Sequence, residues 1–362
     1  MNSSDITTMR LANHHLSLPD FITPESVVAH LGAVQAQDYP AAKWSLGLRM
    51  KNTTESIVEK AINQGKILRT HVMRPTWHFV MPEDIRWMQS LTAPNVKKLM
   101  GHYNRKLELT DELFTKTNKV IIAALGNNQY LTRQELKKLL EEIGIKTDVQ
   151  RLAHIVMWAE LDGLICNGPR RGKQFTYALL DERAPQTKVV SREESLAKLA
   201  LKYFSSHGPA QIKDFAWWSG LSLKDSNEAL SFVKEKLASE TIATKTYWFS
   251  SAKKAQEQTL PKAYLLSIFD EYTIAYKDRT ALSEKRDIER MISMGNALLA
   301  VIILDGKVVG AWKRLLKKDR VVIQLSPFRE REKAEYTALE QAAKRYSEFI
   351  ELPTETVLMR AK

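Results

Sequence analysis

The segment 117–179 constrains the fold most, because three helical patterns in it are followed by a hairpin pattern. Residues 117–125 form an apolar helical stretch, and Thr132-Arg-Gln-Glu135 is a capping box that predicts the start of a second helix. Over 148–162, apolar residues recur at i, i+3, i+4 and i+7, which indicates a third helix. Two apolar runs then flank a basic, glycine-rich turn at 167–173. This order predicts a winged helix-turn-helix unit.

A similar order, with helices followed by strands, occurs before this segment and again after it. In the first, Thr23 and Pro24 are typical of a helix start, and we expect that helix to end near Gln37 or Asp38. In the last, Ser191-Arg-Glu-Glu194 is a second capping box. Further helices are expected at 6–13, 53–64, 211–218 and 224–237, and strands at 67–73, 76–80 and 241–250. The repeated pattern predicts three winged-helix units in tandem.

The last hundred residues have a different pattern. Asp305-Gly306 between the apolar runs 297–304 and 307–313 is a strong signal for a two-residue hairpin, and 321–325 supplies a third strand before a helix at 331–348. We therefore expect an α+β fold, mainly α, in which tandem winged helix-turn-helix units precede a C-terminal β domain. The expected boundaries are 1–105, 106–185, 186–257 and 258–362.

The charge balance points to a polyanionic partner. The chain has 54 Lys and Arg against 42 Asp and Glu, a net charge of +12 and a pI near 9.5, which favours nucleic acid but is also found in ordinary proteins. Basic residues gather on the third predicted helix, at the hairpin tip and at one end of the β domain. The tip is alternatively a solvated turn, and the lysines of the β domain alternatively protect a sheet edge. The candidate DNA contacts are Arg151, His154, Arg170, Arg171, Lys173, Lys313, Arg314, Lys317, Lys318 and Arg320.

Several classes of site are not indicated. The single cysteine, Cys166, excludes an internal disulfide and favours a reducing compartment. The histidines have no metal-ligand spacing, and no glycine-rich nucleotide-binding loop is present, so we expect neither a metal nor a cofactor. The N-terminus lacks a signal peptide, and no apolar run is long enough to span a membrane. These features predict a cytoplasmic protein that associates with the nucleoid.

The polar stretch Gln35-Ala36-Gln37-Asp38 lies at the end of the helix that is expected to begin at Thr23. On a continuing helix, side chains two residues apart point about 200° from one another, so two amides at this spacing cannot face one ligand. Pro40 restricts Tyr39 to extended geometry, which favours a helix end here and allows the two amides to converge. From spacing alone, a polar helix end with solvated glutamines is the favoured explanation of the stretch.

Three segments then carry a resemblance to a known family: Leu31-Gly-Ala-Val-Gln-Ala-Gln-Asp38, Arg74-Pro-Thr-Trp-His-Phe-Val80 and Phe269-Asp-Glu-Tyr-Thr-Ile-Ala-Tyr-Lys-Asp-Arg279. In this order they resemble the AlkZ/YcaQ-type winged-helix DNA glycosylases over most of the chain. The resemblance implies tandem winged helices, scaffolded by a C-terminal β domain, around a concave basic channel for duplex DNA. In that family a Gln-x-Gln motif, or Gln-x-Asp in a second branch, acts on alkylated purines and, in some members, on interstrand crosslinks. Gln35 and Gln37 would be catalytic, as in the AlkZ branch.

Amides suit such chemistry. Alkylation of a purine at N7 or N3 makes the base cationic and a good leaving group without protonation, so little acid catalysis is needed. A glutamine carbonyl can accept a hydrogen bond from the attacking water, although it cannot take its proton as a carboxylate can. Two neutral amides therefore predict a preference for cationic lesions.

Other residues of these segments are weaker candidates. Trp77 and His78 lie beside the sugar or lesion, or belong to the core. Asp38 supports the site or caps the next segment, and Asp270 and Arg279 belong to the site or form a structural ion pair between domains. The expected partner is damaged double-stranded DNA, bound by a monomer.

Two other functions compete with base excision. A winged-helix transcriptional regulator would dimerise on a palindrome and protect a discrete footprint, and the sequence has no evident coiled-coil seam for such a dimer. A structural DNA-binding protein would bind undamaged duplex with steep salt dependence and without lesion preference.

Overall fold

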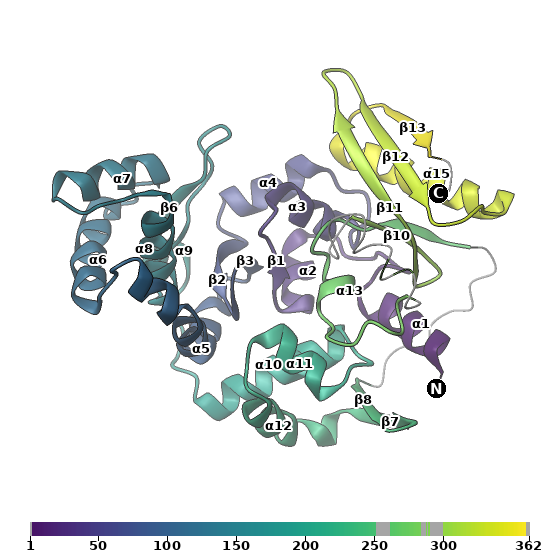
Figure 1. The fold of residues 1–362 in the computed structure, drawn as a ribbon, viewed down its shortest axis with the longest axis horizontal. Coiled ribbons are helices and arrows are strands. Elements are labelled where there is room, and N and C mark those ends of the chain that lie inside the picture. The colour runs from purple at the N-terminus through teal and green to yellow at the C-terminus, as the bar shows by residue number, and fades with distance from the viewer. Residues whose placement is uncertain (1, 251–260, 284–286, 288, 290–299, 360–362) are drawn as a thin grey trace.

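The computed structural model describes residues 2–250, 261–283, 287, 289 and 300–359. The chain has an α+β fold in which the N-terminal residues form the centre, flanked by the helical segments on two sides and by a β-sheet on a third (Figure 1). The central elements are α1 (Ser3–Asn13), α2 (Pro24–Leu31), β1 (Val34–Gln35), α3 (Tyr39–Gly47), α4 (Glu55–Asn63), β2 (Leu68–Val72), β3 (Arg74–Val80) and α5 (Ile85–Lys106). None of the helices in the described ranges is long and apolar enough to cross a membrane.

The helix α2 begins and ends by local signals. The Thr23 side chain accepts from the N–H of Ser26, Pro24 occupies the first turn, and Gly32, with φ +81°, ends the helix in a conformation that favours glycine. The predicted continuation of this helix to Gln37 or Asp38 is therefore wrong. The chain instead enters β1, which pairs with β3 in a three-stranded antiparallel sheet of order β1-β3-β2.

The helix α3 also corrects the prediction at Pro40. Proline disfavours helical geometry in the preceding residue, but Tyr39 is the first helical residue and Pro40 lies in the first turn, where a missing N–H costs no helical hydrogen bond. Asp38 supplies the N-cap, since its carboxylate accepts from the N–H of Ala41 at 3.0 Å.

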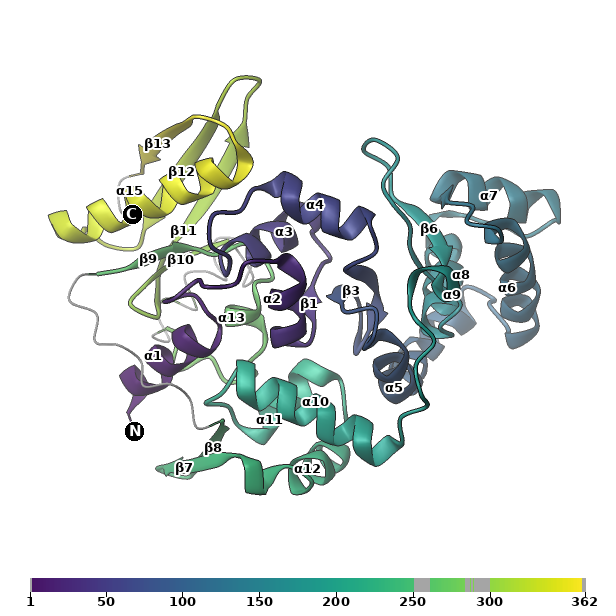
Figure 2. The same ribbon diagram turned by 180° about the vertical axis from the view of Figure 1, so that it is seen from behind.

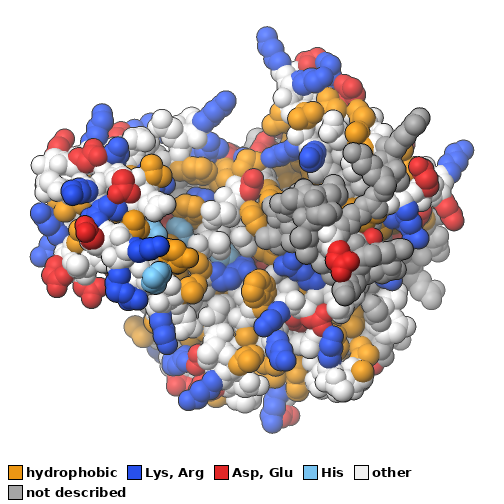
Figure 3. All heavy atoms as spheres, viewed as in Figure 1, with side chains coloured by type: hydrophobic (Ala, Val, Ile, Leu, Met, Phe, Trp, Pro, Cys, Tyr) orange, Lys and Arg blue, Asp and Glu red, His pale blue; other side chains and the backbone are white. Residues whose placement is uncertain are grey.

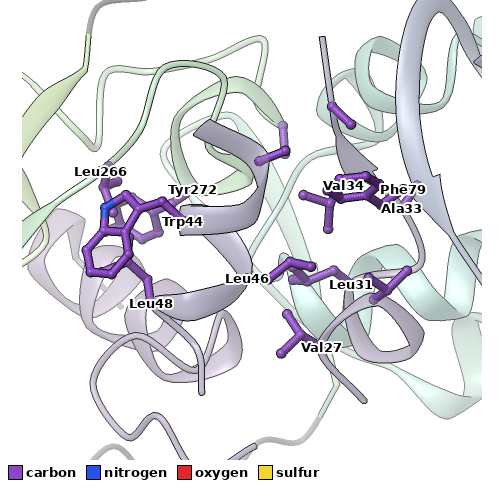
Figure 4. Packing of buried hydrophobic residues seen from close by; sticks show 14 of the residues in the cluster. Val27, Leu31, Ala33, Val34, Trp44, Leu46, Leu48, Phe79, Leu266 and Tyr272 are labelled. Atoms are coloured by element: carbon purple, nitrogen blue, oxygen red, sulfur yellow. The ribbon is translucent and has the colours of Figure 1, made fainter. Parts of the chain in front are cut away.

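The main core joins these elements to the C-terminal half of the chain. Figure 4 shows Val27 and Leu31 of α2 beside Val34 of β1 and Phe79 of β3. On the other side of α3, the indole of Trp44 donates to the Leu265 carbonyl at 2.7 Å and is buried. The sheet that carries Gln35 therefore rests on a continuous apolar core, which keeps its position fixed.

The second segment has its own apolar core. It contains α6 (Asp111–Leu125), β4 (Leu131–Thr132), α7 (Arg133–Glu142), α8 (Val149–Leu161), β5 (Ile165–Asn167), β6 (Thr176–Leu179) and α9 (Leu180–Arg183). The predicted capping box at Thr132 and Glu135 is confirmed, and the three strands form an antiparallel sheet of order β4-β6-β5.

The third segment lies on another side of the centre, next to α2 and α5 (Figure 1). It contains α10 (Arg192–Ser206), α11 (Ile212–Ser219), α12 (Leu223–Ser231), the 3-10 helix η1 (Lys234–Lys236), β7 (Ala238–Ile242) and β8 (Lys245–Phe249). Ser191 is the N-cap of α10, as predicted. The predicted helix at 224–237 is shorter, because α12 ends at Ser231.

The C-terminal segment forms a five-stranded sheet of order β13-β12-β11-β10-β9. It contains β9 (Ala263–Leu265), α13 (Glu271–Ile274), β10 (Val301–Leu304), β11 (Lys307–Leu316), β12 (Val321–Pro327), α15 (Lys333–Ile350) and β13 (Thr354–Leu358). The hairpin at Asp305 and Gly306 is confirmed, with both residues at positive φ. Residues 297–299 of the predicted strand lie outside the described residues.

Two hairpins project in the same direction, with α3 and α4 between them (Figures 1 and 2). One joins β5 to β6 and the other joins β11 to β12. In the space-filling view the surface is hollowed between the two projections, and both end in Lys and Arg side chains (Figure 3).

Candidate active site

The two glutamines of Gln35-Ala36-Gln37 do not lie at a helix end: Gln35 is the last residue of β1, and Gln37 lies in a bend before α3. Gln35 pairs with His78 across β1 and β3, and the pairing continues as the Ala36 N–H donates to the Trp77 carbonyl at 2.7 Å. Both side chains contact β3, Gln35 through Arg74 and Gln37 through the Trp77 N–H.

Gln35 is buried with 7% of its surface exposed, whereas Gln37 is exposed. Arg74, from the start of β3, donates from Nη2 to Gln35 Oε1 at 3.1 Å. Trp77 N–H donates to Gln37 Oε1 at 3.4 Å, which is longer than an ordinary N–H···O bond. One glutamine is therefore firmly held and the other loosely.

His78 lies directly beside this pair but does not reach solvent. Its Nδ1 bonds to the Thr76 carbonyl at 2.9 Å, so Nδ1 carries the proton and Nε2 faces Arg74 Nη2 at 3.5 Å. Burial, and then the charge of Arg74, hold the pKa of His78 well below 6.5. The imidazole is neutral, and it cannot contact DNA in this conformation.

Glu271, the first residue of α13, approaches Gln35 from the side opposite β3. Its carboxylate is fully buried and accepts from the Gln35 backbone N–H at 2.7 Å and from Trp218 Nε1 at 3.0 Å. His207 Nε2 is 3.7 Å from the same carboxylate. Burial lowers the pKa of Arg74, and the charge of Glu271 opposes that change. Gln35 is thus held between an arginine and a carboxylate from distant parts of the chain.

Asp270 pairs with a buried arginine rather than with the glutamine amides. Its two carboxylate oxygens each accept from Arg49 at 2.9 Å, and both side chains are completely buried. Burial raises the pKa of Asp270, but the charge and hydrogen bonds of Arg49 outweigh it and lower the pKa below its usual value. The predicted alternative of an ion pair with Arg279 is wrong, because Arg49 is the partner of Asp270.

Arg279 and Trp77 lie near the glutamines at partly buried positions. Arg279 is close enough to Arg74 for its charge to lower the pKa of Arg74. The Trp77 ring packs under the guanidinium of Arg69, whose Cζ is 4.4 Å from the ring centroid, and against the His71 ring at 4.4 Å. Trp77 therefore belongs to the support of the sheet as well as to the edge of the site.

The comparison with known families decides the family of the chain. A family model described as "DNA glycosylase AlkZ-like" matches residues 28–349. The chain belongs to the AlkZ-like DNA glycosylase family. It is a DNA repair glycosylase, and the alternative of a transcriptional regulator is not favoured.

Individual relatives agree with this assignment. The glycosylase is 24% identical, over 333 residues and 88% of each chain, to the "Interstrand DNA cross-link repair glycosylase" of Streptomyces sahachiroi. Its structure superimposes on that of "Streptomyces sahachiroi DNA glycosylase AlkZ" with a TM-score of 0.80, covering 99% of this chain and 100% of that one at 20% identity. The structural likeness establishes the fold.

The basic residues predicted to contact DNA divide into two groups in the glycosylase. Arg151 is buried, and it donates to the carbonyls of Lys146 at 3.0 Å and of Leu107, so its prediction as a DNA contact is wrong. A helical wheel cannot reveal this, because the guanidinium folds back onto the preceding loop. His154 is half-buried and contacts Asn104 Oδ1 at 2.7 Å, and burial lowers its pKa.

At the two projecting hairpins, most arginines are engaged and the lysines are exposed. Arg170 donates to the Lys173 carbonyl at 2.6 Å, and Arg171 pairs with Glu135 at 2.7 Å. Arg314 donates to the Tyr346 hydroxyl, and Arg320 pairs with Glu355 at 2.9 Å. Lys173, Lys313, Lys317 and Lys318 of these hairpins are exposed, and Arg171 is exposed as well in spite of its ion pair.

The buried histidines make the stability of the glycosylase depend on pH. Burial is the largest cause that lowers the pKa of His14, His78 and His207, and it lowers that of His30 to about 4. Between about pH 6.5 and 4 the unfolded chain binds protons that the folded chain does not, so stability falls as pH falls. We expect His30 alone to contribute about 1 kcal/mol per pH unit in this window.

Urea unfolding at several pH values between 4.5 and 7 measures this dependence. His30→Gln should unfold with a pH slope shallower by about one proton. An unchanged slope in this variant would show that His30 is not held neutral by the fold.

Sequence reasoning missed Arg74 and Glu271 as parts of the site, although both lie in the segments that carry the family resemblance. The available signal was a pair of acidic residues, Asp270 and Glu271, inside an apolar run, since buried charges are retained only where they have partners. Which partners they have depends on contacts between distant segments.

Proposed function

We propose that the enzyme hydrolyses the N-glycosidic bonds of cationic N7- or N3-alkylated purines in duplex DNA and unhooks interstrand crosslinks formed by such alkylation. In this reaction the oxygen of a water molecule bonds to C1′ of the sugar while the C1′–N9 bond breaks. The bonding electrons pass to the purine and neutralise its positive charge, and the proton of the water passes to solvent.

The observation that carries this proposal is the state of the three carboxylates nearest the amides. Asp38 caps α3, Asp270 is bound by Arg49, and Glu271 is buried beneath Gln35. Asp270 and Glu271 are buried against their partners and are not placed to take a proton from water, and the exposed Asp38 has one oxygen bound at the start of α3. A site built from Gln35 and Gln37 therefore suits a leaving group that is already cationic. The printed name of the Streptomyces relative supports the extension to crosslinks.

For the DNA-binding surface, we propose that the helices and hairpins of the three segments are tandem winged-helix units. The duplex would lie in the hollow between the two projecting hairpins (Figure 3), where the ends of α3 and α4 and the amides would face it. Lys173 on one hairpin, and Lys313, Lys317 and Lys318 on the other, would contact phosphates without reading sequence. Exposed Leu315 and Leu316 lie among these lysines. The enzyme would act as a monomer at the nucleoid.

The experiment is base release from duplex DNA methylated with a simple alkylating agent. Wild-type enzyme should release 7-methylguanine or 3-methyladenine, and the double variant Gln35→Ala/Gln37→Ala should release it at least about 100-fold more slowly. Duplex with a defined N7–N7 crosslink, separated on a denaturing gel, tests unhooking. Lys318→Ala is a matched control that should weaken binding without abolishing release. If wild-type enzyme releases no base, or the double variant is as fast, the proposed function is wrong.

A further inference from the structure

The partners of Gln35 and Gln37 determine which end of each amide is available to DNA. A glutamine side chain has an acceptor oxygen and a donor NH2 group, and the two ends are distinguished by their hydrogen-bond partners. Arg74 and the Trp77 backbone N–H are donors only, so the oxygen of each glutamine must face them. This assignment does not depend on a choice between alternative amide orientations.

For Gln35 the orientation is firmly fixed. Its backbone N–H is held by Glu271 at 2.7 Å and its Oε1 by Arg74 at 3.1 Å. Its Nε2 has no protein acceptor in the described chain, and this atom is not shielded from solvent. The small exposed part of an otherwise buried residue is thus the donor end of its amide.

For Gln37 the orientation is loose. The side chain is exposed, and its contact to Trp77 N–H, at 3.4 Å, leaves the carbonyl free to accept a second bond. The two chemically identical side chains therefore differ in what they offer a ligand. One offers a fixed donor, and the other offers an adaptable carbonyl.

We propose that the two glutamines have opposite hydrogen-bonding roles: Gln35 donates from Nε2 to the leaving purine, and Gln37 accepts from the attacking water. Arg74 is then a positioning residue, since it acts through Gln35. This division rests on the proposed function and deepens it.

The chemistry of bond cleavage favours the purine as the partner of Gln35. As the C1′–N9 bond breaks, electrons move into the base, so the acceptor atoms of the purine gain electron density and a donor to them binds more strongly in the transition state. The sugar ring oxygen loses density at the same moment, so a donor there would oppose the reaction. A donor to a phosphate would contribute equally before and during cleavage, which affects binding and not the rate.

The contacts of Arg74 agree with a positioning role. Its Nε is inaccessible to solvent and, in the described part of the structure, has no partner. Its Nη2 faces both Gln35 Oε1 and the lone pair of His78 Nε2. The Nη2 end of the guanidinium is thus directed at the amide, on a side chain that is partly buried.

Glutamate substitutions separate the two roles, because a carboxylate keeps the acceptor and removes the donor. We expect Gln35→Glu to release 7-methylguanine about 100-fold more slowly than wild type under single-turnover conditions, with an unchanged Kd for undamaged duplex. Gln37→Glu should lose much less of the rate than Gln35→Glu, since a carboxylate still accepts a hydrogen bond from water. Gln35→Met and Gln37→Met are matched controls that remove both functions, and both should be slow.

Arg74 is tested by the same assay and by thermal unfolding. Arg74→Met lets the Gln35 amide rotate, so the single-turnover rate should fall while the Kd for undamaged duplex stays constant. Arg74→Lys keeps a donor near Gln35 and should retain more of the rate than Arg74→Met at equal Tm. A loss that follows Tm alone, with no recovery in Arg74→Lys, would overturn the positioning role.

The outcomes for the glutamines are distinct. A slow Gln35→Glu with an active Gln37→Glu supports the division. Equal rates for the two glutamate variants, a slow Gln37→Glu, or a change at Gln35 that appears only in Kd overturns it while leaving the glycosylase function intact. No base release by wild-type enzyme would instead overturn the proposed function itself.

Discussion

Replacing Asp270 with alanine is expected to lower the free energy of unfolding by about 3–5 kcal/mol, the largest stability effect of any single change considered for this enzyme. The substitution leaves the fully buried guanidinium of Arg49 without its carboxylate. It also removes the acceptor for Ser45 Oγ at 2.7 Å and the N-cap of α13 at Tyr272 N–H. Urea unfolding monitored by tryptophan fluorescence measures the loss, and soluble yield reports it if the variant does not fold.

Two further variants test the cause of this loss. Asp181→Ala removes the exposed carboxylate that pairs with Arg86 at 2.8 Å, and we expect it to leave unfolding nearly unchanged. The double variant Arg49→Met/Asp270→Leu removes both buried charges and should recover part of the stability lost in Asp270→Ala. If the double variant is no more stable than the single one, an uncompensated charge is not the cause.

Gly220→Ala is expected to reduce both stability and base release, although Gly220 has no place in the chemistry. Gly220 ends α11 with φ +70°, and a Cβ on it would lie 2.1 Å from the Met73 carbonyl oxygen and 3.6 Å from Arg74 Cγ. The turn before β3 would have to move, and Arg74 with it. We expect a loss of about 2–4 kcal/mol from the strained conformation and the clash together.

Gly144→Ala is the matched control for this change. Gly144 has φ +78°, and a Cβ there meets nothing within 4 Å, so only the conformational cost of about 1 kcal/mol remains. The difference between the two variants isolates the contact with the turn. Gly220→Ala with the stability and the single-turnover rate of Gly144→Ala would contradict the coupling between α11 and Arg74.

The features that the sequence predicted correctly depend on short-range interactions. The capping box at Thr132 and Glu135, and the hairpin at Asp305 and Gly306, involve residues at most three positions apart. The sequence predicts too long a helix after Thr23, because the apolar spacing continues through Val34 into β1. Gly32 is the residue that ends the helix α2. A strand of two residues has no periodicity of its own, so the pattern of the preceding helix was continued into it.

The parts of the site that the sequence did not predict depend on long-range contacts. The motif predicts the positions of Gln35 and Gln37 in the sequence. It predicts neither the orientation of the Gln35 amide nor the residues that hold it. Those residues are Arg74, which is 39 residues away, and Glu271, which is 236 residues away. Arg49 and Asp270 are 221 residues apart, so no local rule pairs them.

The carboxylate of Glu271 also determines at what stage of synthesis the Gln35 backbone can be held in place. Because β1 is the outer strand of its sheet, the Gln35 N–H points away from β3, and Glu271 satisfies it. A growing polypeptide therefore has both glutamines early in its synthesis but lacks the acceptor for the Gln35 N–H until α13 has left the ribosome and docked. A chain terminated before that point would contain both glutamines without the carboxylate that holds the Gln35 backbone.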